Sequence, residues 1–146
     1  MPNHITKSTV IQATAERVFD LLADPWHFNK VNPDLVITDA TPSALGGYDM
    51  CWELRFGAMT LAGESKIIAF ERPSQLVIDT QGGVPSHWVW SIQPNGENGD
   101  GVHLNLALDY IVPKQLAFLG KLLEKQNEKS VEAQVTNLKR LAEADA

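Results

Sequence analysis

The sequence predicts a single α+β domain over residues 1–146, with an antiparallel sheet of about seven strands, two short helices after the first strand and one long C-terminal helix. Three observations predict this arrangement. Residues 4–12 alternate like a strand, residues 35–112 form a nearly unbroken series of strand-like segments, and the last stretch has helical spacing. Because parallel neighbours need crossovers of a dozen or more residues, the short links between these segments favour antiparallel pairing.

The N-terminal part predicts a strand followed by two helices. In residues 4–12, Ile5 and Ile11 lie on one face together with Lys7 and Thr9. Thr14 is a plausible N-cap for the first helix, since its hydroxyl oxygen can accept a backbone N–H. The apolar stripe of that helix is Val18, Phe19, Leu21 and Leu22. Pro25 ends it, and residues 26–31 predict a second short helix.

Six further strands are predicted, each bounded by Gly, Pro or other turn residues. Their expected ranges are 35–41, 48–56, 59–71, 76–80, 86–93 and 102–112. Three of them alternate clearly and place large apolar side chains on one face. These inward residues are Tyr48, Met50, Trp52, Leu54 and Phe56, then Trp88, Trp90 and Ile92, then Val102, Leu104, Leu106, Leu108 and Tyr110. One face of the sheet is therefore expected to be apolar and the other wetter.

The strand over residues 59–71 is ambiguous, because both parities contain apolar residues. Glu64 and Lys66 alternate with Ala62, Ile68 and Phe70. We expect the two charged side chains to face solvent.

The C-terminal helix is expected from about Pro113 to Ala142. Its inward stripe contains leucines and, in the middle, polar residues: Leu116, Leu119, Leu123, Asn127, Ser130, Gln134, Leu138 and Leu141. A helix that turns amides as well as leucines toward a sheet is typical of the roof of a cavity. The alternative is a helix rotated or bent so that these amides reach water. Gly120 indicates a close approach, a bend or room for a ligand.

Bulk properties narrow the functional classes. A composition of 44% hydrophobic and 21% charged residues is that of a globular protein, and no apolar run reaches the roughly 18 residues of a membrane span. The net charge is −6 and the basic residues are scattered, so nucleic-acid binding is not expected. Cys51 is the single cysteine, which excludes an intramolecular disulfide and fits a cytoplasmic protein. We expect a monomer or a homodimer.

Neither a metal nor a cofactor is expected. The four histidines, His4, His27, His87 and His103, have none of the spacings typical of zinc sites, and a lone cysteine supplies no thiolate pair. The sequence contains no Gly-x-Ser-x-Gly nucleophile elbow and no phosphate-binding loop.

Two local motifs resemble the START-like helix-grip superfamily, in particular its polyketide cyclase/dehydrase branch. Residues 14–19, Thr-Ala-Glu-Arg-Val-Phe, followed by Asp24-Pro25, are similar to the first-helix pattern of that branch. Residues 70–77, Phe-Glu-Arg-Pro-Ser-Gln-Leu-Val, resemble its strand-to-strand corner. The likeness covers nearly the whole chain. One departure is that Trp26 comes early, with Val31-Asn32-Pro33 where many members carry a tryptophan before the proline, so the pocket mouth is expected to differ.

The resemblance implies a curved sheet wrapped around the C-terminal helix, with a cavity between them for an apolar or amphipathic small molecule. Our first hypothesis is a protein that binds a hydrophobic or aromatic ligand there. The candidate binding residues are Tyr48, Met50, Trp52, Trp88, Trp90, Leu106, Tyr110, Leu119, Leu123, Asn127 and Ser130. The same aromatic residues would equally suit ordinary core packing.

Two further hypotheses use the same groove. One is a cyclase or dehydratase with acid–base help from Tyr110, Tyr48 or His27. The other is an interaction module for a protein or lipid partner. The scarcity of ionisable residues on the predicted inner face favours ligand binding, because Glu53, Arg55 and Asp109 have the opposite parity. For these three, a solvated position or a cross-strand ion pair is expected.

Overall fold

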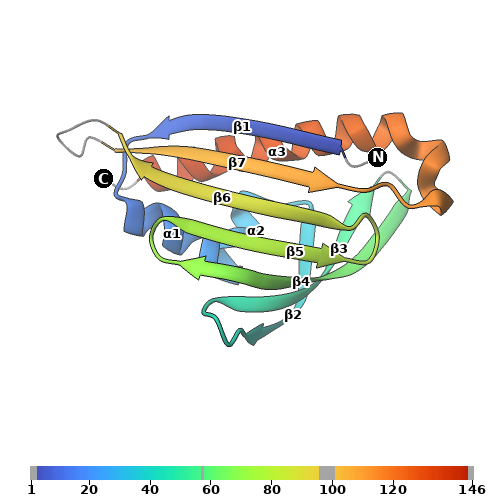
Figure 1. The fold of residues 1–146 in the computed structure, drawn as a ribbon, viewed down its shortest axis with the longest axis horizontal. Coiled ribbons are helices and arrows are strands. Elements are labelled where there is room, and N and C mark those ends of the chain that lie inside the picture. The colour runs from blue at the N-terminus through green and yellow to red at the C-terminus, as the bar shows by residue number, and fades with distance from the viewer. Residues whose placement is uncertain (1–2, 57, 96–100, 145–146) are drawn as a thin grey trace.

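The computed structural model describes residues 3–56, 58–95 and 101–144. All strands form one seven-stranded antiparallel sheet in the order β1-β7-β6-β5-β4-β3-β2 (Figure 1). The strands are β1 (Asn3–Ile11), β2 (Leu35–Pro42), β3 (Tyr48–Phe56), β4 (Met59–Glu71), β5 (Gln75–Gln81), β6 (Ser86–Pro94) and β7 (Val102–Tyr110). The α+β class, the helix-grip architecture and the strand order along the chain are thus confirmed. The seventh strand ends two residues earlier than predicted.

Two short helices follow β1, and both begin with side-chain caps. The Thr14 hydroxyl accepts the backbone N–H of Arg17 at 3.2 Å and opens α1 (Ala15–Ala23). The Asp24 carboxylate accepts the N–H of Trp26 at 2.9 Å and opens α2 (Pro25–Val31). The proline that ends α1 is therefore also the first residue of α2, a position where its missing N–H costs nothing.

The C-terminal helix differs from the prediction at its start. Residues Lys114–Leu119 form a 3-10 helix, and α3 runs from Gly120 to Glu143. Leu116 and Leu119 are half-buried because the tighter 3-10 winding turns them off the stripe that α3 buries. Gly120 makes no close approach, since a Cβ there would meet nothing within 4 Å. The buried stripe of α3 is Leu123, Val131, Gln134, Val135, Leu138 and Ala142.

The C-terminal half of α3 is attached to the N-terminal elements by side-chain hydrogen bonds to backbone carbonyls. The donors and acceptors are Arg17 to Leu141 and Ala142, Asn137 to Val31, and Lys139 to Val10, at 2.5 to 3.1 Å. The Arg17 contacts occupy carbonyls in the last turn of α3, which have no partner within the helix. These bonds fix α3 against β1, α1 and α2, and Figure 1 shows α3 running behind β1 and β7.

Strand β4 places Glu64 and Lys66 in solvent and buries Ser65 and Ile67, which confirms the expected parity of the charged pair. A register shift between Ile67 and Ala69 then reverses the parity. Beyond it, the Phe70 ring reaches the core and meets Phe19 edge to face, with centroids 5.0 Å apart.

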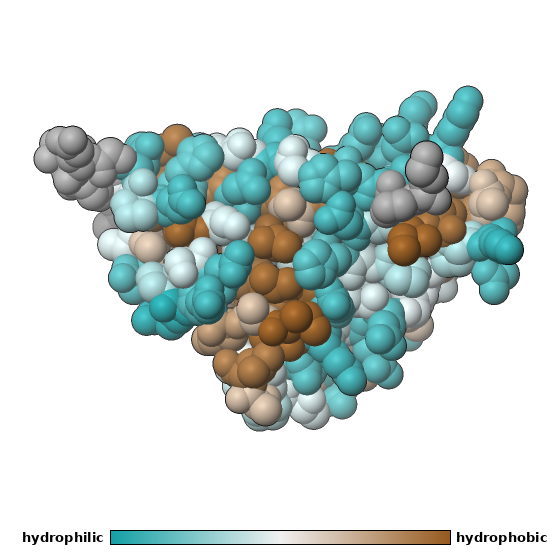
Figure 2. All heavy atoms as spheres, in the orientation of Figure 1, coloured by the Kyte–Doolittle hydropathy of each residue, from teal (hydrophilic) through white to brown (hydrophobic). Residues whose placement is uncertain are grey.

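The outer face of the sheet combines apolar and charged residues. One cross-strand row, Thr6, Ala107, Val89 and Val77, is continued by Ile68 at the register shift, and Figure 2 shows an apolar band across this face. A parallel row is made of ionisable residues, and we call it the outer charge row: His4, Asp109, His87, Asp79 and Lys66. His4 Nδ1 is 2.5 Å from Asp109, and His87 contacts Asp79. The expected cross-strand pairing of Asp109 is present.

None of the helices in the described part of the chain combines the length and hydropathy that a membrane crossing needs.

Gly63 gives the clearest packing constraint in the sheet. A Cβ at this position would lie 2.5 Å from the Trp52 ring and 2.5 Å from the Gln81 carbonyl oxygen. The backbone oxygen cannot move aside cheaply, so Trp52 can lie across β4 only because residue 63 has no side chain.

Gly63→Ala should therefore lower the free energy of unfolding by about 1–3 kcal/mol and shift the tryptophan emission spectrum. Gly120→Ala is the matched control. It should leave the spectrum unchanged and raise stability by less than about 1 kcal/mol, because a helical glycine is replaced in open space. Denaturant unfolding of both variants measures this, and equal effects at the two sites would contradict the packing assignment.

Candidate functional site

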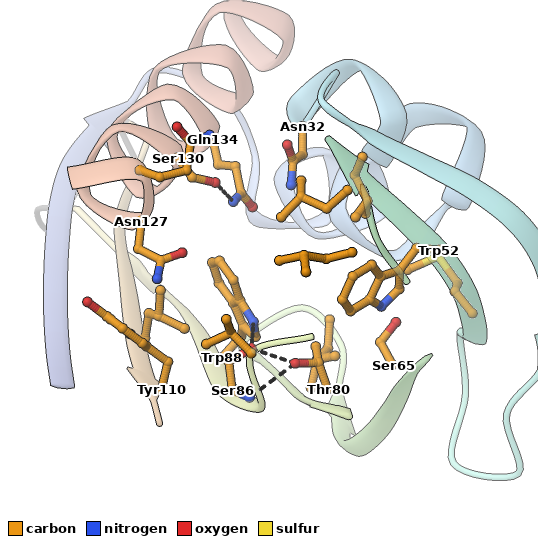
Figure 3. Close-up of a pocket in the computed structure, with 18 of the residues that line it drawn as sticks. Asn32, Trp52, Ser65, Thr80, Ser86, Trp88, Tyr110, Asn127, Ser130 and Gln134 are labelled. Carbon is orange, nitrogen blue, oxygen red and sulfur yellow. Dashed lines mark hydrogen bonds between the residues drawn. The ribbon is translucent and has the colours of Figure 1, made fainter. Parts of the chain in front are cut away.

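A cavity lies between the inner face of the sheet and the N-terminal half of α3 (Figure 3). About 100 Å³ is open to the centres of water molecules, which is enough for several waters. Its apolar lining comes from the sheet, α2 and α3: Phe28, Leu35, Met50, Trp52, Leu54, Leu61, Ile78, Val84, Trp88, Trp90, Leu108 and Leu123. Its polar lining is Asn32, Ser65, Thr80, Ser86, Tyr110, Gln126, Asn127, Ser130 and Gln134.

Three tryptophans form much of the wall. Trp52 comes from β3, while Trp88 and Trp90 come from β6 two residues apart, so strand alternation turns all three inward. Trp90 and Trp52 are buried and Trp88 is half-buried. The Trp88 indole N–H donates to the Ser86 hydroxyl at 2.9 Å. Its partner is thus on the same strand of the sheet.

Four hydroxyl side chains cross the floor of the cavity in register. Ser65 pairs with Thr80, Thr80 with Ser86, and Ser86 with Tyr110, on β4, β5, β6 and β7. We call these four residues the hydroxyl row. At about 4.8 Å per strand, the row extends for about 14 Å. Its central pair is bonded, with the Thr80 and Ser86 oxygens 2.5 Å apart and the Ser86 N–H donating to Thr80 at 3.1 Å.

Ser65 is the exception in the row. It is 5% exposed, and its Oγ is covered and has no hydrogen-bond partner. Figure 3 shows this hydroxyl next to Trp52 at the floor of the cavity. A buried hydroxyl without a partner costs about 1–3 kcal/mol relative to a bonded one. The cavity floor therefore contains one polar group whose hydrogen bonding is incomplete.

The roof supplies amides from α3. Gln134 is only 1% exposed, and its Nε2 donates to the Ser130 hydroxyl at 3.0 Å. Figure 3 shows the amide end of Gln134 pointing into the cavity. The sequence had left open a rotated helix whose amides reach water, and the burial of Gln134 excludes that alternative for this residue.

Tyr110 is the one ionisable residue in the described lining. Burial raises the pKa of its phenol, the Asn127 amide opposes that shift, and the nearby Glu124 and Glu128 carboxylates add to it. Because the ordinary pKa of tyrosine is already about 10, the phenol is neutral at physiological pH and can donate a hydrogen bond.

Four of the predicted site residues lie elsewhere. Leu106 is fully buried in the core, and Leu119 is half-buried on the 3-10 helix. Tyr48 shares the inward parity of Met50 and Trp52, but it lies at the start of β3, about 7 Å beyond Met50 along the strand. It is 42% exposed and lines a separate groove between α2 and β2.

His27 lines that same groove and not the cavity. It is exposed on α2, where its Nδ1 is 3.0 Å from Asp24. Neither His27 nor Tyr48 is therefore placed for acid–base chemistry inside the cavity.

The sequence reasoning missed the polar floor. Ser65, Thr80 and Ser86 are isolated small polar residues in three different strands, and no local motif connects them. Gln126 and Asn32 were also missed, although Gln126 is adjacent to Asn127 on the helix. A signal existed in the strand alternation of β5 and β6, where Thr80 and Ser86 have the same parity as Ile78 and Trp88.

In the described part of the chain, no group of three or more His, Cys, Asp and Glu side chains is placed to hold a metal ion.

Fold and site together define a class: a small domain whose curved antiparallel sheet grips a C-terminal helix over a mainly apolar cavity. Residues 2–143 match the model of one family within this class, described as polyketide cyclase / dehydrase and lipid transport. The chain belongs to that family. No curated protein sequence matches the chain.

Solved structures share the fold over nearly the whole chain. The protein TTHA0849 from Thermus thermophilus is 19% identical with a TM-score of 0.73, covering 99% of this chain and 100% of that one. A START superfamily protein from Mycobacterium smegmatis is 18% identical with a TM-score of 0.76, covering 96% and 97%. The di-domain ARO/CYC protein BexL is 14% identical with a TM-score of 0.78, covering 99% of this chain and 51% of that protein. Identities this low show the fold alone.

Ser65→Ala should raise the free energy of unfolding by about 1 kcal/mol, because it removes a buried hydroxyl that has no partner. Ser91→Ala makes the same chemical change on the outer face of β6 and should alter stability by less than about 0.5 kcal/mol. Urea unfolding of the ligand-free proteins measures both. A clear loss of stability in Ser65→Ala would show that the hydroxyl is already bonded.

Proposed function

We propose that this protein binds a hydrophobic or aromatic small molecule in the cavity between the sheet and α3. The observation that carries the proposal is the composition of the lining, which combines three tryptophans with hydroxyls and amides from two opposed surfaces. Large apolar walls with a few placed polar groups are the usual form of small-molecule sites. In a purely structural core, turning Gln134, Asn127 and Ser65 toward a common space would cost free energy, because buried polar groups need hydrogen-bond partners.

The family description supports the proposal, because it includes lipid transport beside polyketide chemistry. The solved relatives include both a START superfamily protein and an ARO/CYC protein, so the fold accommodates more than one use. The support for binding in this chain therefore comes from the residues that line its cavity.

Catalysis in the same cavity would depend on few groups. Acid–base chemistry requires a side chain that exchanges protons near neutral pH, and the described lining offers the Tyr110 phenol, whose pKa is raised. Tyr48 and His27, the other two candidates, line the groove beside β2. The geometry favours binding and orientation over proton transfer.

The proposal is tested first on protein purified from its own cells. Native mass spectrometry should show a co-purifying small molecule, or the emptied protein should bind a neutral naphthyl probe with saturable quenching of tryptophan emission. Quenching is expected because three of the four tryptophans line the cavity.

Asn127→Leu should weaken binding of a carbonyl-bearing naphthyl probe by about tenfold while leaving the fold intact, because it replaces a polar contact on α3 with an apolar side chain. Asn105→Leu is the matched control, since Asn105 lies on the outer face of β7. Titration calorimetry measures the affinities and circular dichroism checks the fold. Equal affinities for wild type and Asn127→Leu would remove Asn127 from the site.

A further inference from the structure

We propose that the ligand of this cavity is uncharged and presents an oxygen acceptor, such as a carbonyl, to the hydroxyl row. This inference rests on the proposed binding function and names the chemical class that the site selects. It follows from two observations: the absence of charged side chains in the described lining, and the hydrogen-bond capacity that Ser65, Thr80 and Ser86 leave free.

The charge argument comes from the lining. Of the described residues around the cavity, none is Asp, Glu, Lys, Arg or His, and Tyr110 is neutral at physiological pH. A carboxylate or phosphate taken into this space would lose water without gaining a counter-ion, which is among the most unfavourable transfers in proteins. The two charges that act on the Tyr110 phenol, Glu124 and Glu128 on α3, are exposed carboxylates that would repel an anion placed beside it.

Transfer of a cation into this cavity is also unfavourable. No carboxylate lines the described cavity, and the hydroxyls and amides supply dipoles but no full negative charge. The indole faces could hold a cation by cation–π contact, but the hydroxyl row turns O–H groups toward the same space. The lining therefore selects for neutral molecules.

The hydrogen-bond donors and acceptors that are left free at the cavity floor indicate which polar group the ligand carries. The Thr80 and Ser86 oxygens share one hydrogen, Ser86 Oγ also accepts from Trp88, and Thr80 Oγ1 also accepts from the Ser86 backbone. Whichever hydroxyl donates within the pair, the other keeps one O–H without an acceptor. Ser65 Oγ, the covered neighbour in the row, also has no partner. The floor thus has two O–H donors without an acceptor, together with three unused lone pairs. A buried donor without an acceptor is tolerated less well than an oxygen with an unused lone pair, so the two O–H groups decide which ligand group fits.

A ligand that matches this floor carries an acceptor, and a carbonyl oxygen can accept from two hydroxyls at once. Its body must be apolar and flat enough to lie against Trp52, Trp88 and Trp90. At the roof, the buried amide of Gln134 is positioned for a second polar group of the same molecule.

The test uses three naphthalene probes of the same ring substitution: a hydroxynaphthamide, the isosteric hydroxynaphthoate and a methylnaphthol that lacks the carbonyl. Titration calorimetry at neutral pH compares them on the full-length wild-type protein. The amide should bind at least about tenfold more tightly than the carboxylate and several-fold more tightly than the methyl compound.

Two variants tie the preference to the cavity. Thr80→Val combined with Ser86→Ala removes both hydroxyls of the central pair and should remove the advantage of the amide over the methyl compound. The matched pair of changes on the outer face, Thr6→Val with Ser91→Ala, should keep it. Asn127→Lys places a cation at the cavity wall, in a partly exposed position where lysine can be accommodated, and should improve carboxylate binding by about tenfold or more.

The outcomes separate the two proposals. If the wild-type protein binds no probe and yields no co-purifying molecule, the binding function fails, and this inference fails with it. If the carboxylate binds as tightly as the amide, or if the double change Thr80→Val and Ser86→Ala leaves the amide preference unchanged, the binding function stands and this inference is overturned.

Discussion

The cavity depends on how α3 is held. Its C-terminal half is bonded to three other elements through Arg17, Asn137 and Lys139, and it buries Val131, Val135, Leu138 and Ala142. Glu143 completes the attachment. Its carboxylate accepts hydrogen bonds from the backbone N–H of Gln12 and from the Lys139 ammonium group, and both bonds lower the pKa of the carboxyl group. Between Gly120 and Ser130, Leu123 alone is buried. A helix fixed at one end and only lightly packed at the other leaves space above the sheet, and Gln126, Asn127, Ser130 and Gln134 face that space.

Much of this could be predicted from local patterns. Strand alternation placed Trp52, Trp88, Trp90 and Tyr110 on one face, and helical spacing placed Asn127 and Ser130 opposite them, because both periodicities are properties of a single element. The hydroxyl row could not be read this way. It requires the register of three strand pairs at once, and a sequence states parity within a strand but not which residues of two strands face each other.

The errors have physical causes of the same kind. The start of the helix was misplaced because Lys114–Leu119 has apolar spacing yet winds as a 3-10 helix. Strand β4 looked ambiguous because the register shift after Ile67 reverses its parity, so that Leu61 and Ile67 face inward before the shift and Phe70 faces inward after it. Tyr48 has the correct parity and the wrong position along the strand. Leu106 also has the correct parity, but its side chain is fully buried in the core and does not line the cavity.

Register also determines the electrostatics of the site. Each member of the hydroxyl row is adjacent in sequence to a member of the outer charge row: Ser65 to Lys66, Thr80 to Asp79, Ser86 to His87 and Tyr110 to Asp109. A slip of one residue toward these neighbours would replace a hydroxyl with an ionisable side chain inside the cavity. Pairing among the outer charges, as in His4 with Asp109 and His87 with Asp79, favours the observed register. The absence of charged side chains from the described lining of the cavity is thus supported from the opposite face of the same sheet, and it depends on the register of the whole sheet.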